Sequence, residues 1–271
     1  MTLHLYPELD QGTPEWLNAR CGILTASVIG QLVSSRQPSA IEADCPECGA
    51  DAIQPCVGKR SPGPLKTLHP ARAATARTMD RVISADLDND TARSLILTLA
   101  AERITQYVEP LPMSRDMERG TLDEPYAREV YAERFAPVDE LGFMVREFHG
   151  YKLGYSPDGL VGDNGLIEIK SRKQKIQLKA FLNDEVPAEN IAQIQTGLIV
   201  SGRDWCDYVS YCGGMPLYVK RVHPDPTWHE AILDAAELTE RQISTIVDTY
   251  LARTANNPPT ERIDHYLEMS I

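Results

Sequence analysis

The stretch GYSPDGLVGDNGLIEIKSRK, residues 154–173, predicts a β-hairpin whose second strand carries charged side chains. Glu168 and Lys170 are two residues apart on that strand, so their side chains leave the sheet on the same face. Ile167 and Ile169 point to the opposite face, where we expect the hydrophobic core. The strand therefore presents a carboxylate and an amine on the face turned away from the isoleucines.

The turn of the hairpin decides whether Asp158 shares that face. A two-residue loop would place Asp158 and Glu168 on opposite faces of the sheet. A three-residue loop over residues 163–165 (DNG), with its glycine in the left-handed conformation, is a common alternative. This loop sets Leu160 opposite Glu168 and Asp158 opposite Lys170, so that all three polar side chains lie on one face.

Two carboxylates and one amine on one face are suited to the hydrolysis of a phosphodiester. Asp158, Glu168 and the backbone carbonyl of Ile169 can hold Mg²⁺ or Mn²⁺, since these ions prefer oxygen ligands. Lys170 can orient or deprotonate the attacking water and neutralise developing negative charge. The alternative is an ordinary turn with an exposed Glu168–Lys170 ion pair, because such short patterns arise often.

The segments around the hairpin predict an α/β protein. Predicted helices cover residues 14–19, 70–108 with a break near 88–90, 123–135, 188–201 and 226–253, and another runs from Thr25 or Ser27 to Val33. Further predicted strands cover residues 143–148, 205–212 and 216–222. Helices, then strands interrupted by one helix, then a long helix are typical of a mixed sheet flanked by helices.

Residues 42–72 predict a small insert within a single domain of residues 1–271. Proline, glycine and cysteine dominate this part of the chain, and no helical or strand period survives there. A complete tetrahedral zinc shell, as in a zinc knuckle, would be formed by Cys45, Cys48, Cys56 and His69. The alternative is an unstructured insert with reduced cysteines, in which His69 caps the next helix. The cations that would let the knuckle touch DNA are Lys59, Arg60, Lys66 and Arg72.

The composition is that of an ordinary globular protein, because 42% of the 271 residues are hydrophobic and 24% are charged. No apolar run approaches the ~18 residues of a membrane span. The N-terminus lacks a secretory signal. We therefore expect a cytoplasmic protein with no membrane partner, in which cysteines are thiols or metal ligands.

The net charge of −12 counts against a protein that coats nucleic acid nonspecifically. It leaves room for a local basic groove. The predicted groove is the stretch Lys170, Arg172, Lys173, Lys175 and Lys179. The alternative for this stretch is a solvated helix face.

The hairpin segments SPDGLV and GLIEIKS resemble the active-site hairpin of the YqaJ-type viral recombinases, the phage lambda exonuclease family of PD-(D/E)XK nucleases. EWLNARCGILTAS, residues 15–27, resembles the family's first motif, in which an arginine and a serine bind the phosphate at the DNA end. The resemblance implies this role for Arg20 and Ser27. The alternative is a capped helix with a solvated Arg20.

Two further motifs continue the resemblance. RGTLDEPYAREVYAE, residues 119–133, resembles the second motif, whose glutamate joins the metal shell; the matching residue is Glu124, which is also spaced for an ion pair with Arg128. Residues 191–212 resemble the family's glutamine-bearing helix and the strand that follows it. Gln193 and Gln195 are the candidates there, with Gln195 preferred over Gln193. The alternative is a purely structural role, which is usual for glutamines on a half-buried helix.

The four motifs occur in the family's order, so the resemblance implies a restriction-endonuclease-like α/β core with a central mixed β-sheet. It also implies a magnesium-dependent 5′–3′ exonuclease that degrades one strand of linear double-stranded DNA. The overhang would feed a phage single-strand annealing protein during homologous recombination in a bacterial host. Some members form homo-oligomeric rings that enclose DNA.

Two alternatives to the exonuclease stay open at this level. One is a PD-(D/E)XK endonuclease of the restriction or resolvase type, which would cut closed circles. The other is a non-catalytic, zinc-containing DNA-binding protein. The presence of Asp158, Glu168 and Lys170 together favours an enzyme over the second alternative.

Overall fold

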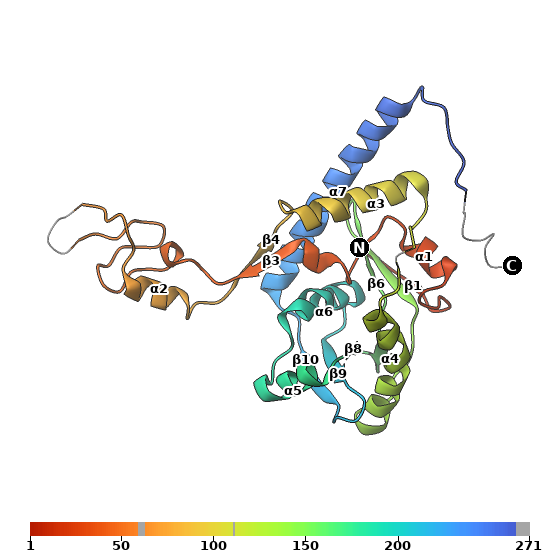
Figure 1. Cartoon of the computed structure of the whole chain (residues 1–271), viewed down its shortest axis with the longest axis horizontal. Helices are drawn as coiled ribbons and strands as arrows, with labels where there is room; N and C mark the ends of the chain where they lie inside the picture. Colours follow the sequence, from red (N-terminus) through yellow and green to blue (C-terminus); the bar gives the residue numbers. More distant parts are fainter. Residues whose placement is uncertain (59–62, 111, 264–271) are drawn as a thin grey trace.

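The computed structural model describes residues 1–58, 63–110 and 112–263, which form two four-stranded sheets with helices around them (Figure 1). The strands are β1 (Thr2–Tyr6), β2 (Leu24–Thr25), β3 (Val33–Arg36), β4 (Val82–Ala85), β5 (Phe143–Glu147), β6 (Lys152–Tyr155), β7 (Gly159–Val161), β8 (Gly165–Ser171), β9 (Trp205–Tyr211) and β10 (Tyr218–Val222). The helices are α1 (Pro14–Arg20), α2 (Pro70–Ala76), α3 (Asp90–Thr105), α4 (Arg115–Arg134), α5 (Gln174–Asn183), α6 (Ala188–Ser201) and α7 (Pro226–Thr254), with short 3-10 turns at Ile29–Gln31 and Ala40–Glu42.

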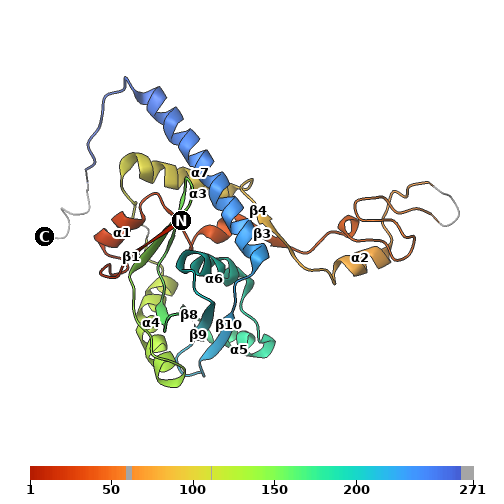
Figure 2. The same ribbon diagram turned by 180° about the vertical axis from the view of Figure 1, so that it is seen from behind.

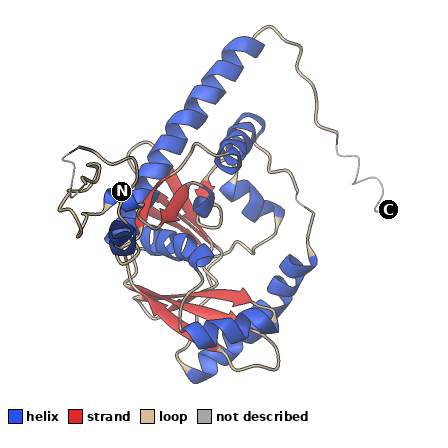
Figure 3. Ribbon diagram, turned by 60° about the vertical axis from the view of Figure 1, so that its left-hand side comes forward, coloured by secondary structure: helices blue, strands red, loops and turns tan. Residues whose placement is uncertain are grey.

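Both four-stranded sheets are mixed, which confirms the predicted α/β class (Figure 3). One has the order β1-β5-β6-β2 and the other β10-β9-β8-β7. In the first, only β2 and β6 run parallel, and in the second, only β8 and β9 do. The strands expected to form one central sheet are thus divided between two, because β6 pairs with β5 and not with β7.

Most predicted elements are present, and their ends follow local capping. Helix α4 begins eight residues before the predicted start at residue 123, because the Ser114 hydroxyl accepts a hydrogen bond from the Met117 amide. The Asp225 carboxylate caps α7 by accepting from Thr227 and Trp228. Helix α6 covers the predicted residues 188–201.

One predicted helix is wrong, and a second prediction is right only in part. The segment from Thr25 to Val33 contains the end of β2 and a 3-10 turn, because Leu24 and Thr25 pair with β6. The helical pattern predicted over residues 70–108 is confirmed by α2 and by α3, which begins at the predicted break, but β4 interrupts it by pairing antiparallel with β3. Pairing with a strand distant in sequence overrode the local helical pattern in both places.

The strands β3 and β4 form a two-stranded ribbon that carries the insert away from the body of the protein (Figures 1 and 2). The predicted insert, 42–72, lies within the excursion of residues 37–81 between these strands. Arg72 does not face DNA as expected, because its side chain is fully buried inside the insert. Lys66 is exposed, and Lys59 and Arg60 lie outside the described residues.

Strand β8 lies between two hydrophobic clusters. Ile167 and Ile169 pack with Tyr131 of α4 in the smaller cluster, which confirms their predicted direction. Leu166, on the other face of β8, belongs to the larger cluster, which includes Leu198 of α6. Glu168 therefore emerges on the Leu166 face of the strand. In the part of the chain that the structure describes, no helix combines the length and apolar character needed to cross a membrane.

Candidate active site

The β7–β8 hairpin places Asp158 and Glu168 on one face, although its register differs from the prediction. Gly159 pairs with Ile167 and Val161 with Gly165, so the turn is residues 162–164. Gly162, with φ of +52°, takes the left-handed position that was predicted for Gly165. The register is shifted by two residues, which preserves the face of every side chain.

Gly165 is required by a close approach and not by the turn. A Cβ at this position would lie 2.2 Å from the ring of Trp205 on the neighbouring strand β9. Arg203 Nη1 also donates hydrogen bonds to the carbonyls of Gly162 and Gly165, at 2.7 and 2.8 Å. The connection before β9 thus fixes the turn of the hairpin.

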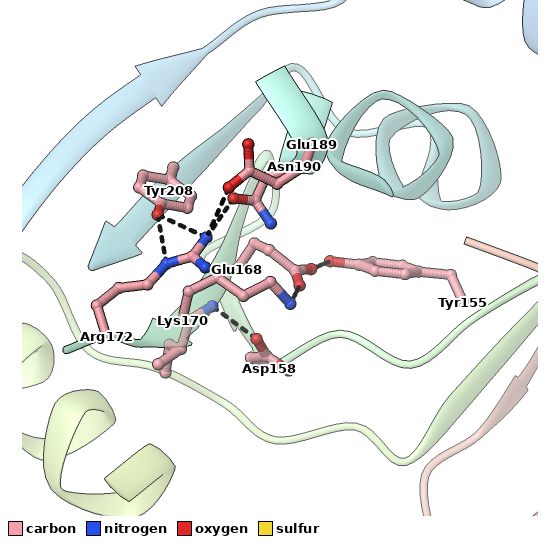
Figure 4. Close-up of polar contacts among 9 residues, drawn as sticks. Tyr155, Asp158, Glu168, Lys170, Arg172, Glu189, Asn190 and Tyr208 are labelled. Carbon is pink, nitrogen blue, oxygen red and sulfur yellow. Dashed lines mark hydrogen bonds and ion pairs between the residues drawn. The ribbon is translucent and has the colours of Figure 1, made fainter. Parts of the chain in front are cut away.

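Hydrogen bonds hold each charged side chain of the hairpin, and together these side chains form a compact group (Figure 4). Lys170 Nζ donates to Glu168 Oε1 at 2.6 Å, and the Tyr155 hydroxyl donates to Glu168 Oε2 at 3.3 Å. The Ile169 amide donates to Asp158 Oδ2 at 2.6 Å. Glu168 is fully buried, so the exposed ion pair considered from the sequence is not what forms.

Helix α4 adds Glu124 and Arg128 to this group. Arg128 Nη2 donates to Glu124 Oε1, and Arg128 Nε donates to the backbone carbonyl of Asp158 at 2.8 Å. The ion pair expected from the i,i+4 spacing is therefore present, and it holds Glu124 beside the hairpin. The two interpretations of Glu124, an ion-pair partner and a metal ligand, are compatible.

Negative charge is crowded in the group. Burial, followed by the charge of Glu168, raises the pKa of Asp158 well above its ordinary value. Burial also raises the pKa of Glu124, against the opposing charge of Arg128. Burial by itself would lower the pKa of Lys170, but the charges of Glu168 and Asp158 raise it. Lys170 is thus an ammonium that balances part of the carboxylate charge.

The α1–β2 segment brings Arg20 and Ser27 to the same place. Arg20 Nη2 donates to the Thr25 hydroxyl at 3.1 Å and to the Ser27 hydroxyl at 3.4 Å, and its guanidinium stacks 4.2 Å from the centre of the Trp16 ring. Trp16 Nε1 donates to the Ser156 hydroxyl at 2.9 Å. Burial lowers the pKa of Arg20, so this guanidinium is not the solvated side chain of the alternative interpretation.

A single cavity of about 500 Å³ joins these segments. Its lining includes the predicted residues Arg20, Ser27, Glu124, Asp158, Glu168, Ile169 and Lys170. Residues that the sequence analysis did not single out also line it, among them Trp16, Thr25, Tyr155 and Ser171. Tyr155 and Ser156 lie at the start of the stretch 154–173, two to three residues before Asp158, which is the signal that would have marked them.

The preferred glutamine is not in the cavity. Gln193 lines it, whereas the Gln195 side chain is buried elsewhere. Gln195 Nε2 donates to the His223 carbonyl at 2.9 Å, and its Oε1 accepts from the Asp225 amide at 3.0 Å. Gln195 thus connects α6 to the start of α7, and Gln193 takes its place as the candidate.

The donors in the cavity fit a hard divalent cation. Three carboxylates, those of Glu124, Asp158 and Glu168, line it together with Ile169, whose side chain packs in the opposite cluster. Oxygen ligands of this kind suit Mg²⁺ or Mn²⁺. A divalent cation would also offset the carboxylate repulsion that helps to raise the pKa of Asp158.

The insert contains a second group of potential metal ligands. The ligand atoms of Cys45, Cys48, Cys56 and His69 all lie within 4.8 Å of one another. His69 occupies the N-cap position of α2 but makes no capping hydrogen bond, and its Nδ1 lies 3.4 Å from Cys45 Sγ. Three sulfurs and one imidazole in a tetrahedron suit Zn²⁺.

Only part of the predicted basic stretch after the hairpin lines a common pocket. Arg172, Lys173 and Lys175 line one pocket together with Arg119 of α4, which the sequence analysis did not single out. Lys179 is not among the residues that line this pocket.

Comparisons with known proteins agree with this geometry. A family model described as YqaJ-like viral recombinase domain matches residues 68–204, which include Glu124, Gln193 and the whole hairpin. A second model, described as "Putative DNA-binding phage zinc finger domain", matches residues 12–86. An alkaline exonuclease from Laribacter hongkongensis is 25% identical, with a TM-score of 0.64 over 90% of this chain and 98% of that chain. Its complex with dAMP is 24% identical, with a TM-score of 0.65 over 91% and 100%. No curated protein matches the chain.

Proposed function

This chain belongs to the YqaJ-like viral recombinase family, and we propose that it is a Mg²⁺-dependent exonuclease that degrades one strand of linear double-stranded DNA from the 5′ end. Its likeness to an alkaline exonuclease supports a nuclease that acts on DNA. The observation that carries the proposal is the single cavity into which three carboxylates, Lys170 and the Arg20–Ser27 pair all project.

Each cavity residue has a role that follows from its contacts. Asp158 is fixed by the Ile169 amide and Glu168 by Tyr155, so their carboxylates are preorganised. With Glu124 and the Ile169 carbonyl they would hold the divalent cation, which when bound polarises the phosphate and acidifies a water. Lys170, bound to Glu168 at 2.6 Å, supplies positive charge beside the scissile phosphate.

The 5′ polarity is supported by the Arg20–Ser27 pair, which lines the same cavity as the carboxylates. Arg20 and Ser27 offer a guanidinium and a hydroxyl, which are suited to a phosphate monoester. A strand whose terminal 5′-phosphate lay there would present its first internucleotide bond to the carboxylates. Release of one nucleotide at a time follows from that arrangement.

Linear duplex DNA with a 5′-phosphate on only one strand tests the function directly. We expect Mg²⁺ to cause mononucleotide release from the phosphorylated strand, with little release from the 5′-hydroxyl strand and no cutting of closed circles. EDTA should abolish the activity. Because EDTA can also remove zinc, we expect Mg²⁺ added without Zn²⁺ to restore it in a short incubation.

Two outcomes would contradict this function. Cutting of closed circular DNA would indicate an endonuclease of the same superfamily. Retained DNA binding with no turnover in any divalent metal would indicate a non-catalytic DNA-binding protein.

The two glutamines of α6 should respond differently to truncation. Gln195→Ala is expected to lower the free energy of unfolding by about 1–3 kcal/mol, because backbone groups of His223 and Asp225 lose their partner. Gln193→Ala should leave stability within about 0.5 kcal/mol and slow strand degradation. Denaturant titration and initial rates measure the two effects. Equal loss of activity with unchanged stability in both variants would contradict the assignment.

We further infer that Cys45, Cys48, Cys56 and His69 hold a structural Zn²⁺. The match to a phage zinc finger model over residues 12–86 supports this inference. Delivery of the single-stranded product to a phage annealing protein in the bacterial cytoplasm is supported by family membership alone. Assembly into a homo-oligomeric ring likewise stays a prediction.

A further inference from the structure

A basic pocket of about 580 Å³ adjoins the catalytic cavity at the end of β8. Its cationic lining residues are Arg119, Arg172, Lys173 and Lys175. Ser171 links the two cavities, because it lines the catalytic one and accepts a hydrogen bond at 3.0 Å from Nε of Arg119, which lines the basic pocket. The Ser171 hydroxyl in turn donates to Asp123 Oδ2 at 2.6 Å, so α4 and β8 are tied together at this junction.

Arg172 is held in one orientation by buried partners (Figure 4). Its Nε and Nη2 donate to the Tyr208 hydroxyl at 3.3 and 3.2 Å, and Nη2 also donates to Asn190 Oδ1. Tyr208 is fully buried and Asn190 nearly so. Glu189, which is largely exposed, forms a long ion pair with Arg172 Nη2 at 3.9 Å. Within the described ranges Nη1 makes no hydrogen bond, so a preorganised guanidinium keeps donors for a ligand.

The other cations differ in how far their charge is already offset. Asp116 pairs with Arg119 at 2.7 Å and with Lys173 at 3.0 Å. Hydrogen bonds from Lys173 and then Arg119 lower the pKa of Asp116, so this carboxylate stays ionised. Lys175 forms no ion pair with any residue that the structure describes. The positive charge available to an anion is therefore that of Lys175 and that of Arg172, which is offset only by the long ion pair with exposed Glu189.

We propose that this basic pocket binds the second internucleotide phosphate of the degraded strand, with Arg172 as its principal ligand. The inference rests on the proposed function. Lys170 lies on β8, and Arg172 directly follows the strand with its amide still bonded to the Tyr211 carbonyl of β9. On an extended backbone the two side chains leave on the same side, with Cα atoms about 7 Å apart. A strand with its 5′-phosphate at Arg20 and its scissile phosphate at Lys170 then presents the next phosphate to Arg172, whose planar fork suits phosphate oxygens.

Neutral methylphosphonate linkages test this contact one phosphate at a time. The measured quantity is kcat/KM for release of the first nucleotide from 5′-phosphorylated duplexes that carry the neutral linkage at the second or the fifth internucleotide position. In the wild-type protein we expect the second-position linkage to lower kcat/KM about tenfold, mainly through KM, and the fifth-position linkage to change it little.

Arg172→Gln should lower kcat/KM on unmodified DNA by a similar factor, and the second-position linkage should then cause no further loss. The salt dependence of duplex binding should also weaken, by about 0.7–0.9 in the slope of log K against log salt. Arg241→Gln, which removes the same charge from an exposed ion pair on α7, is the matched control and should behave like wild type. If Arg172→Gln fails to fold, Lys175→Gln replaces it as the test variant, because Lys175 is exposed. The loss of kcat/KM caused by the second-position linkage should then be smaller than in wild type, though not abolished.

Three results would separate the inference from its competitors. Additive losses from Arg172→Gln and the second-position linkage would overturn it. The inference would also be overturned if Arg172→Gln kept the wild-type kcat/KM and altered only the inhibition by added deoxynucleoside monophosphate. The pocket would then bind the product and not the substrate strand. Failure of wild type to degrade unmodified DNA would contradict the proposed function instead, and fluorescence anisotropy with the same duplexes would still test the pocket.

Discussion

Asp158→Asn is expected to slow strand degradation by about three orders of magnitude or more while leaving the protein folded. The amide keeps an oxygen that can accept the Ile169 N–H bond, so the local backbone should not change. It removes one of the negative charges needed to hold a divalent cation. Because burial, and after it the charges of Glu168 and Glu124, disfavour the ionised Asp158 carboxylate, the melting temperature should stay the same or rise.

Single-turnover degradation of 5′-phosphorylated duplex and thermal unfolding together measure this effect. Asp163→Asn is the matched control, because this substitution makes the same chemical change in the exposed turn of the same hairpin. The control should degrade DNA at the wild-type rate. Undiminished activity in Asp158→Asn, or a loss that is matched by unfolding, would remove Asp158 from the proposed metal site.

Arg72→Met is expected to unfold the insert and to release its zinc while the body of the protein stays intact. The Arg72 guanidinium donates to four backbone carbonyls, at 2.7 Å to Ala43, 2.6 Å to Gln54, 3.0 Å to Ile41 and 2.7 Å to Asp51. Methionine has a similar length but no donors. The insert should lose about 3 kcal/mol or more, because several buried carbonyls are left without a partner at once.

The body should be unaffected, since none of the insert residues that the structure describes (37–58 and 63–81) belongs to the main hydrophobic cluster around β8. In limited proteolysis we therefore expect slow cleavage within residues 37–81 of the wild-type protein and fast cleavage there in Arg72→Met. Arg72→Met should also retain zinc about 10–100-fold less tightly than wild type. Arg77→Met, an exposed arginine at the end of α2, is the control. Equal protease resistance in both variants would show that zinc alone organises the insert.

The buried Arg72 also changes the view of how the insert folds. The sequence predicts a segment with too few apolar residues to form a core, stabilised by zinc. Cys45 and Cys56 are indeed buried, but so is a guanidinium that uses backbone carbonyls of the surrounding loop as acceptors. Arg72 Nη1 also donates to Cys56 Sγ at 3.6 Å, so the arginine and the proposed zinc would stabilise the same loop.

Local pattern alone determined the parts of this protein that depend on backbone periodicity. Alternation along residues 165–171 placed Ile167 and Ile169 in the core and Glu168 on the opposite face, as the structure shows. Face assignment survived a register error of two residues, because side chains on a strand repeat every two positions. The helices α6 and α7 were predicted for the same reason, since their apolar spacing is regular.

Contacts between distant segments decided the remainder. Gln193 and Gln195 differ by about 200° around α6, and only the neighbouring elements determine which of the two meets the cavity. The sequence predicts that Gly165 is a turn residue, whereas in the structure the Trp205 ring occupies the space that a Cβ at this position would need. Arg72 and Arg119 look like surface cations, but one is buried by the insert's own carbonyls and the other lines the basic pocket. These roles depend on which groups the fold brings within a few ångströms, and periodicity along the chain carries no information about that.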